Sequence, residues 1–310
     1  MVFPSKATAD SLGHAARMAE VEGRSLWKDA RTRFWRNKAA VVSLYVLIAI
    51  CLFAFFGGFL AQWSNEEIDW TALGVAAAEH GRPSFATGHF FGVDNDGRDL
   101  YARTVQGTRM SILVGLVGAA VAVAVGTLWG ATAGYVGGRT DQVMMRIVDV
   151  MMSIPFMFVL ILLLVMFGRS IVMIFVGIGL ISWLDMARIA RGQTLSIKNK
   201  EFVEAAIAIG VRPMTIILRH IVPNLLGIVI VYATLLIPGM IITESFISYL
   251  GLGVQEPNTS LGALISRGAG QMTNGTLWML LYPLCFLIVM LYAFFFVGDG
   301  LRDALDPKDR

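Results

Sequence analysis

The residues of this chain that most resemble a chemical site are the acids of the segment Asp94-Asn95-Asp96-Gly97. Spaced carboxylates followed by a glycine are typical of calcium-binding loops. With Gly97 at the sixth loop position, however, Gly92 and Arg103 would take the first and twelfth positions, where calcium needs acidic ligands. We therefore interpret the segment as a turn in which Asp and Asn side chains bond the neighbouring backbone.

Other patterns of catalytic or metal-binding residues are missing from the sequence. The four histidines are scattered, and Cys51 and Cys285 lie far apart inside apolar runs, so neither residue type has the spacing of a zinc site. No Gly-Lys dipeptide occurs, which excludes a Walker A loop, and no G-x-S-x-G nucleophile motif is present. The sequence predicts no catalytic residue, no bound metal and no directly bound cofactor.

The composition places the chain in a membrane. Of the 310 residues, 56% are hydrophobic and only 15% are charged, whereas globular chains are about 25% charged. The mean hydropathy is +0.68. These values exclude a disordered chain, a DNA-binding protein and a soluble enzyme with one compact core. The net charge of +3 is therefore interpreted by where the basic residues lie, and no nucleic-acid partner is expected.

Stretches of about 20 apolar residues mark the membrane spans, and the sequence contains six, one of them short. The fold class expected is an all-α polytopic membrane protein with six transmembrane helices. The expected spans are residues 39–61, 111–135, 147–167, 168–186, 221–243 and 277–297. The other expected segments are a tail with an amphipathic helix (1–38), an outer segment (62–110), an inner loop (185–220) and a second tail (298–310).

The distribution of basic residues predicts the orientation. The two tails and the loops on their side of the membrane hold 19 of the 25 lysines and arginines. Because cytoplasmic loops carry an excess of these residues, both termini are expected in the cytoplasm. Within the first tail, Trp27, Ala30 and Phe34 have the spacing of an amphipathic helix lying along the inner leaflet.

The most informative inner segment is residues 200–209, whose Glu, Ala and Ile content favours a short helix. Gly210 is placed to end it, and Pro213 suits the start of the next helix. Phe202, Val203, Ala206 and Ile209 can share one face, while Glu201 and Glu204 point elsewhere. Ala205 and Ala206 would let another surface approach closely. A helix lying on lipid is the alternative, but two acids on a basic loop do not suit an anionic leaflet.

Small residues recur every four positions in the second span. Gly126, Gly130, Gly134 and Gly138 form this stripe. Small residues at this spacing allow close packing of transmembrane helices, which predicts a partner helix within the chain or in a neighbouring subunit.

Asp149 is expected to be the acid lying deepest in the membrane. Ionisable residues in spans often line a water-filled path. Because Asp149 lies three residues after Arg146, an interfacial ion pair with that arginine is equally consistent with the sequence.

Several motifs together resemble one family. Glu204-Ala205-Ala206, followed by Gly210 and then Val222-Pro223, resembles the EAA loop of ABC importer permeases. The motifs Gly92-Val93-Asp94 with Gly97-Arg98-Asp99-Leu100, Ser248–Gly253 and Gly298–Pro307, together with the stretch 20–45, are similar to the peptide-transport branch of that family. They are closest to oligopeptide permease C subunits.

The resemblance implies a type I ABC importer fold and a permease that moves oligopeptides across the bacterial inner membrane by alternating access. It implies that Glu201, Glu204, Ala205, Ala206, Gly210 and Pro223 form a coupling helix and loop that dock on a cytoplasmic ATPase. It implies partners as well: a second related permease, two ATPases that bind ATP and Mg, and an extracytoplasmic peptide-binding protein. The alternatives are another cargo, such as dipeptides or nickel chelates, and an ion-driven secondary transporter.

Overall fold

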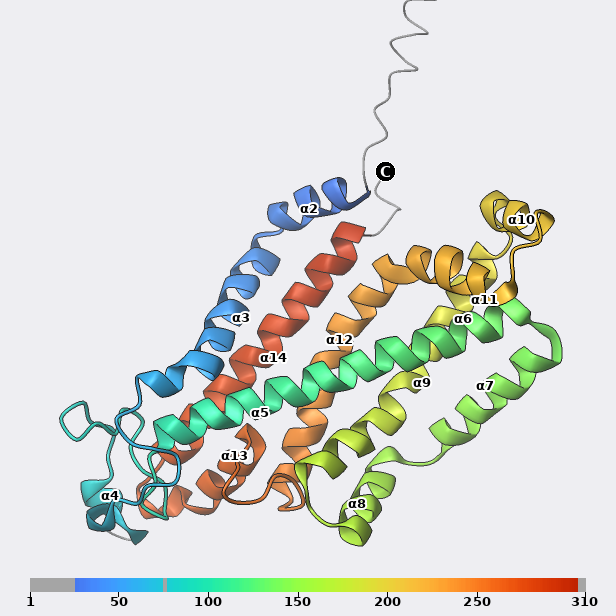
Figure 1. Cartoon of the computed structure of the whole chain (residues 1–310). Coiled ribbons are helices and arrows are strands. Elements are labelled where there is room, and N and C mark those ends of the chain that lie inside the picture. The colour runs from blue at the N-terminus through green and yellow to red at the C-terminus, as the bar shows by residue number, and fades with distance from the viewer. Residues whose placement is uncertain (1–25, 75–76, 306–310) are drawn as a thin grey trace, which may run out of the picture.

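The computed structural model describes residues 26–74 and 77–305, which form a helical bundle (Figure 1). Within these two ranges there is no strand, and extended backbone pairs only at two isolated bridges, Ile68 with Arg98 and Val93 with Asp99. The expected all-α class is confirmed.

Five helical runs in the described residues are long and apolar enough to cross a membrane, and a bent pair of helices makes a sixth. In chain order the crossings are α3 (Lys38–Phe56) with η1 (Gly57–Phe59); α5 (Leu100–Val121) with the π-turn η4 (Ala122–Gly126) and α6 (Thr127–Val136); the pair α7 (Gly138–Ser153) and α8 (Phe156–Phe167); α9 (Ile171–Ile197); α11 (Pro213–Ile216) with η5 (Ile217–Ile221) and α12 (Val222–Tyr249); and α14 (Trp278–Leu305). The shorter elements are α2 (Leu26–Arg36), η2 (Trp70–Ala72), α4 (Ala77–His80), α10 (Glu201–Ala208), α13 (Leu261–Gly270) and η6 (Met272–Asn274).

The third crossing differs from the single helix over 147–167 that the sequence predicts. It consists of α7 and α8, whose axes differ by 77°. Pro155 explains the break, because a proline disfavours helical geometry in the residue before it, and Ile154 is extended with ψ 125°. The apolar pattern continues across the break, so hydropathy alone did not indicate it.

Most crossings extend past the apolar stretches that predict them. The second begins at Leu100 instead of residue 111, and the last continues to Leu305. The short fourth stretch becomes the 27-residue helix α9 by including the polar residues that follow it.

The interior of the bundle surrounds α12, which contacts α5, α9, α13 and α14. Its fully buried side chains include Leu225 and Ile241, which pack with Met186 of α9 and Met290 of α14 in one apolar cluster. Helix α12 thus joins the second, fourth and sixth crossings.

The sequence predicts that α2 lies along the inner leaflet, and the structure shows contacts of α2 with the bundle. Ala30 and Phe34 are buried against Val297 and Ala304 of α14. Its apolar face is therefore used, in part, inside the chain. The side chain of Trp27 lies outside the described residues.

The two ends of the bundle carry different structures (Figure 1). One end carries the segment between α3 and α5, residues 60–74 and 77–99, which we call the lobe, together with α13. The opposite end carries α2, α10 and the end of α14. Both described ends of the chain therefore lie at the end of the bundle that carries α10.

Candidate functional site

Helix α10 is the first candidate site. Lys200 stands before its first turn with extended backbone, and Glu201 and Glu204 occupy that turn, where negative charge is favourable to the helix dipole. Val203 and Ala206 are buried in the chain, and the other residues of the helix are exposed. Only these two small side chains of α10 are therefore packed into the chain.

The face predicted for α10 is not the face observed. Phe202 is 42% and Ile209 80% exposed, so they do not join Val203 and Ala206 in the interior. Ala206 is covered by its own chain, and Ala205 alone of the alanine pair is exposed. The exposed surface combines two acids, Glu201 and Glu204, with the apolar side chains Phe202, Ile207, Ile209 and Met214.

Gly210 ends α10 as the sequence predicts. Its φ is +78°, in the left-handed region that favours glycine. The N–H of Gly210 donates to the carbonyl of Ile207 at 2.9 Å, and the N–H of Val211 donates to the carbonyl of Ala206 at 3.0 Å. These two bonds form a Schellman motif, which fixes the direction in which the chain returns to the bundle.

Pro223 lies apart from that turn. It is exposed in the first turn of α12, after the π-helical residues 217–221, whereas α10 itself contacts α11. Pro223 is the second residue of α12 and, as a proline, has no backbone N–H to donate to the π-helical turn before it.

The glycine stripe packs inside the chain, against α9. A Cβ on Gly126 would lie 2.6 Å from the carbonyl of Trp183, and one on Gly134 would lie 2.9 Å from the carbonyl of Arg191. Gly130 meets the backbone of α9 at Ala187 in the same way. Gly138 is not part of this contact: it begins α7 with φ +57° and has nothing within 4 Å of a Cβ. The helix ends at Val136, which removes Gly138 from the stripe.

Asp149 pairs with Arg188 of α9, not with Arg146. The guanidinium Nη2 donates to Asp149 Oδ1 at 2.6 Å, and the two side chains are 49% and 47% exposed. The partner of Asp149 is therefore supplied by the neighbouring helix α9 and not by α7 itself.

The acid buried deepest in the bundle is Glu244, which sequence reasoning missed. It is fully buried in α12 and accepts hydrogen bonds from Ser248 at 2.6 Å and from Ser111 of α5 at 3.2 Å. The expected span stopped at Thr243 because Glu244 interrupts the apolar stretch. The neighbouring serines, Ser245 and Ser248, were the signal that this acid has partners within the membrane.

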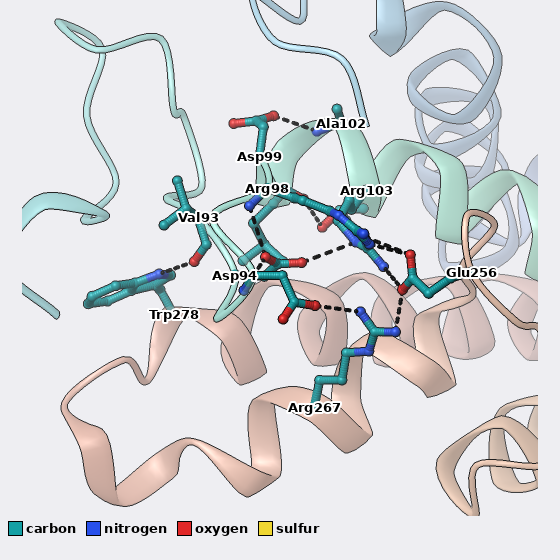
Figure 2. Close-up of polar contacts among 12 residues, drawn as sticks. Val93, Asp94, Arg98, Asp99, Ala102, Arg103, Glu256, Arg267 and Trp278 are labelled. Atoms are coloured by element: carbon teal, nitrogen blue, oxygen red, sulfur yellow. Dashed lines mark hydrogen bonds and ion pairs between the residues drawn. The ribbon is translucent and has the colours of Figure 1, made fainter. Parts of the chain in front are cut away.

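The lobe carries a network of ion pairs that fastens it to the bundle (Figure 2). Arg103, in the first turns of α5, is fully buried; its Nη2 donates to Glu256 Oε1 at 2.7 Å, and its Nε lies 3.4 Å from Asp94 Oδ2. Glu256 also pairs with Arg98 of the lobe and with Arg267 of α13. One carboxylate thus joins three segments that are far apart in sequence.

The network sets the charge state of its acids. Burial by itself raises the pKa of Glu256, but the hydrogen bond and charge of Arg103, together with Arg267, outweigh burial and hold the pKa at about 2. Burial raises the pKa of Asp94, against the opposing charge of Arg103. Asp94 also accepts the backbone N–H groups of Asp96 and Arg98, both at 2.9 Å, which confirms the turn.

A second buried contact in the lobe involves His89. Its Nδ1 lies 2.9 Å from Asp99 Oδ1 and its Nε2 3.4 Å from Asp69 Oδ2, while its ring stacks on Trp63. Asp99 also caps α5 by accepting the N–H of Ala102 at 2.7 Å. Within the described residues, no group of three or more His, Cys, Asp or Glu side chains is arranged to hold a metal ion.

Comparison with known proteins gives consistent matches over the whole chain. The family model described as the binding-protein-dependent transport system inner membrane component matches residues 126–310, and the N-terminal TM domain of oligopeptide transport permease C matches residues 25–76.

Several curated relatives match nearly end to end. The oligopeptide transport system permease protein OppC of Escherichia coli is 54% identical, with 99% of each chain covered. OppC of Haemophilus influenzae is also 54% identical, over 94% of this chain and 91% of the relative. The dipeptide transport system permease protein DppC of Bacillus subtilis is 40% identical, over 92% and 87%.

A solved structure supports the fold. An inward-facing form of the MetNI methionine ABC transporter aligns with a TM-score of 0.50 at 20% identity, covering 65% of this chain and 93% of the other.

Proposed function

The chain belongs to the family of binding-protein-dependent transport system inner membrane components, and from this premise we propose that it forms part of the membrane path of an ATP-driven oligopeptide importer. The cargo follows from the relatives that match it end to end, which are named oligopeptide permeases. Peptides would cross as the bundle alternates between states open to either side.

The energy would come from other chains. The sequence has no Walker A loop, so ATP and Mg would be bound by two separate ATPase subunits. A second, related permease would complete the path, and an extracytoplasmic peptide-binding protein would deliver the peptide. The basic residues support an orientation with both termini and α10 in the cytoplasm and the lobe outside.

The observation that carries this proposal is the exposed surface of α10. Helix α10 and the turn after it, as far as Met214, show four large apolar side chains and two acids, and α10 buries only Val203 and Ala206. Such a surface is suited to a protein surface that covers it. In this arrangement Glu204 would pair with a basic group of the ATPase, and Ala205 would allow close approach. Gly210 would fix the helix to the bundle, so that movement of the ATPase moves α12.

The test is co-purification of the ATPases with tagged variants of the chain, followed by peptide uptake. Glu204→Lys places like charge at the contact, and Gly210→Val forces a β-branched residue into the left-handed region; both should abolish ATPase binding and uptake while the subunit still inserts. The controls are Glu66→Lys, an exposed acid of the lobe, and Gly192→Ala, which has open space around it.

Uptake should require ATP and the binding protein and should not depend on ion gradients. Normal ATPase binding by both α10 variants would contradict the docking site. Uptake that continues without ATP but stops when the proton or sodium gradient is dissipated would favour the ion-driven alternative, and a preference for dipeptides or nickel chelates would change only the cargo.

A further inference from the structure

The ion pair between Asp149 and Arg188 lies in the half of its two crossings that is nearer to α10. Arg188 is nine residues before the end of α9 at Ile197, and Asp149 is eleven residues after the start of α7 at Gly138. At about 1.5 Å per residue, both lie roughly 15 Å from the α10 end of their helices, and Arg188 lies about 25 Å from the start of α9 at Ile171.

Nearly half of each side chain of this pair is exposed. The exposed surface of α3 shows what a lipid-facing helix of this chain looks like: its large exposed side chains include Val42, Leu52, Phe55 and Phe56. By contrast, Asp149, Arg188 and the exposed Asp185 are charged. Other exposed side chains of these two helices, such as Val150 and Leu180, are apolar. Because charges within spans are costly in lipid, the patch that the three charged side chains form suits water or polar groups.

The break between α7 and α8 is a second, independent observation beside the ion pair. Ser153, Ile154 and Pro155 are all exposed, one turn beyond Asp149. The Ser153 hydroxyl bonds the carbonyl of Val150 at 2.7 Å, and Ile154 N–H reaches the carbonyl of Met151 at 3.4 Å. Irregular backbone at membrane depth is tolerated where it is buried in protein or lines a water-filled cavity, and here it is not buried by its own chain.

We propose that the charged patch of α7 and α9 lines the water-filled path. Asp149 and Arg188 then form transient ion pairs with the opposite charges of a zwitterionic peptide. The inference rests on the proposed function, because it assumes that the assembled importer carries peptides. Its chemistry is the exchange of one ion pair for another, with the amino group of the peptide at Asp149 and the carboxylate at Arg188.

A neighbouring pair on the same two helices shows why Asp149 and Arg188 are suited to exchange. Arg191 donates to both oxygens of Asp141, at 2.5 and 2.6 Å, and Asp141 is only 13% exposed. Arg188 makes a single bond to one oxygen of Asp149. Both carboxylate oxygens of Asp141 are therefore occupied by Arg191. The Asp149–Arg188 pair instead retains a carboxylate oxygen and guanidinium N–H groups that can bind water or a ligand.

The experiment measures water access in the assembled complex. Cys51 and Cys285 are replaced by alanine, and a single cysteine is introduced by Asp149→Cys or, in a second variant, by Arg188→Cys. Leu52→Cys on α3, 53% exposed, is the lipid-facing control. A charged methanethiosulfonate reagent is added without nucleotide and with ATP plus vanadate, in the presence and absence of excess peptide and its binding protein.

We expect the thiol at position 149 or 188 to react at least about tenfold faster than the control in one of the two states, and peptide to slow that reaction. Asp149→Asn and Arg188→Gln should each lower uptake about tenfold, the size expected for one lost charge-assisted bond, while ATPase binding is retained. Asp141→Asn should instead lower the stability of the subunit.

Reaction at the control rate in both states, or no protection by peptide, would overturn the inference. These outcomes are distinguishable from failure of the proposed function. A complex that binds its ATPases and imports peptide, yet leaves positions 149 and 188 unreactive, contradicts only the path assignment, whereas a chain without ATPases contradicts the proposed function itself.

Discussion

The two ends of the bundle differ in the burial of their charged residues. At the lobe end, Arg103 is fully buried and its charge is met by Glu256 and Asp94 of the same chain. At the α10 end, Glu201 and Glu204 are exposed next to apolar side chains that are also exposed. The buried charge of the lobe end is thus met within the chain, whereas the acids of α10 face outward.

This difference indicates where the chain can be changed without losing its fold. Removing one partner of a buried ion pair leaves an uncompensated charge, so substitutions in the lobe network should lower the stability of the fold. Substitution of an exposed residue changes the stability of its own chain little, so substitutions on α10 should affect mainly the binding of a partner subunit. The contrast implies a large loss of stability for substitutions in the lobe network and a small one for substitutions on α10.

The largest change is expected for Arg103→Leu. The substitution leaves Asp94 buried without its cation and removes the link from α5 to Glu256, and breaking a buried pair costs about 3 kcal/mol or more. Thermal unfolding of the purified subunit in detergent should show a clear loss of stability. The control Arg82→Leu removes an exposed arginine that bonds only the carbonyl of Ala78 among the described contacts, and should change little. Equal stability of the two variants would contradict a self-contained lobe.

A smaller change is expected on acidification of the lobe. The pKa of Glu256 is about 2 in the fold, below its ordinary value near 4.5, so its ionised form stabilises the fold above pH 4.5, and this contribution is lost as the pH falls toward 2. Asp94 acts in the opposite direction because burial raises its pKa.

The measurement is stability against pH between 5 and 3, in the wild type and in Glu256→Gln. Because Glu256 is 34% exposed, screening reduces its contribution to about 1 kcal/mol. The variant should be less stable at pH 5 and should lose less on acidification. A wild type and variant with parallel pH profiles would show that the Arg103, Arg98 and Arg267 contacts do not hold the lobe.

The fold could be predicted from the sequence because lipid imposes a simple rule on helix length and hydropathy. The same rule explains the errors. It ends a span at the first charge, so it missed the turns of α5 before Ser111, which carry Arg103, and the turns of α12 after Thr243, which carry Glu244. Those charges are tolerated because residues more than a hundred positions away, Glu256 and Ser111, bond them.

A candidate site could be predicted from the sequence to the extent that its geometry is local and does not depend on tertiary contacts. Gly210 depends on local backbone geometry, and its positive φ follows from its neighbours in sequence. Asp149 depends on which helix lies beside α7, and the sequence alone offered Arg146 where the fold supplies Arg188. The ion pairs of the lobe depend wholly on tertiary contacts, and the sequence showed only the turn at Asp94.

The smallest change in stability is expected at the α10 end. Ile209, 80% exposed, contributes little to the fold of its own chain, so Ile209→Ser should alter the stability of the isolated subunit by no more than about 0.5 kcal/mol. In the complex the same side chain would fill an apolar contact, where one anchor residue is worth about 2 kcal/mol or more of binding. ATPase binding, measured by titrating the detergent-solubilised permease, should therefore weaken roughly thirtyfold.

Phe85→Ser is the matched control, because Phe85 is 86% exposed on the lobe, at the opposite end of the bundle, and should change neither quantity. If Ile209→Ser instead destabilised the isolated subunit and left ATPase binding intact, α10 would belong with the lobe as a self-contained element, and the contrast between the two ends would fail.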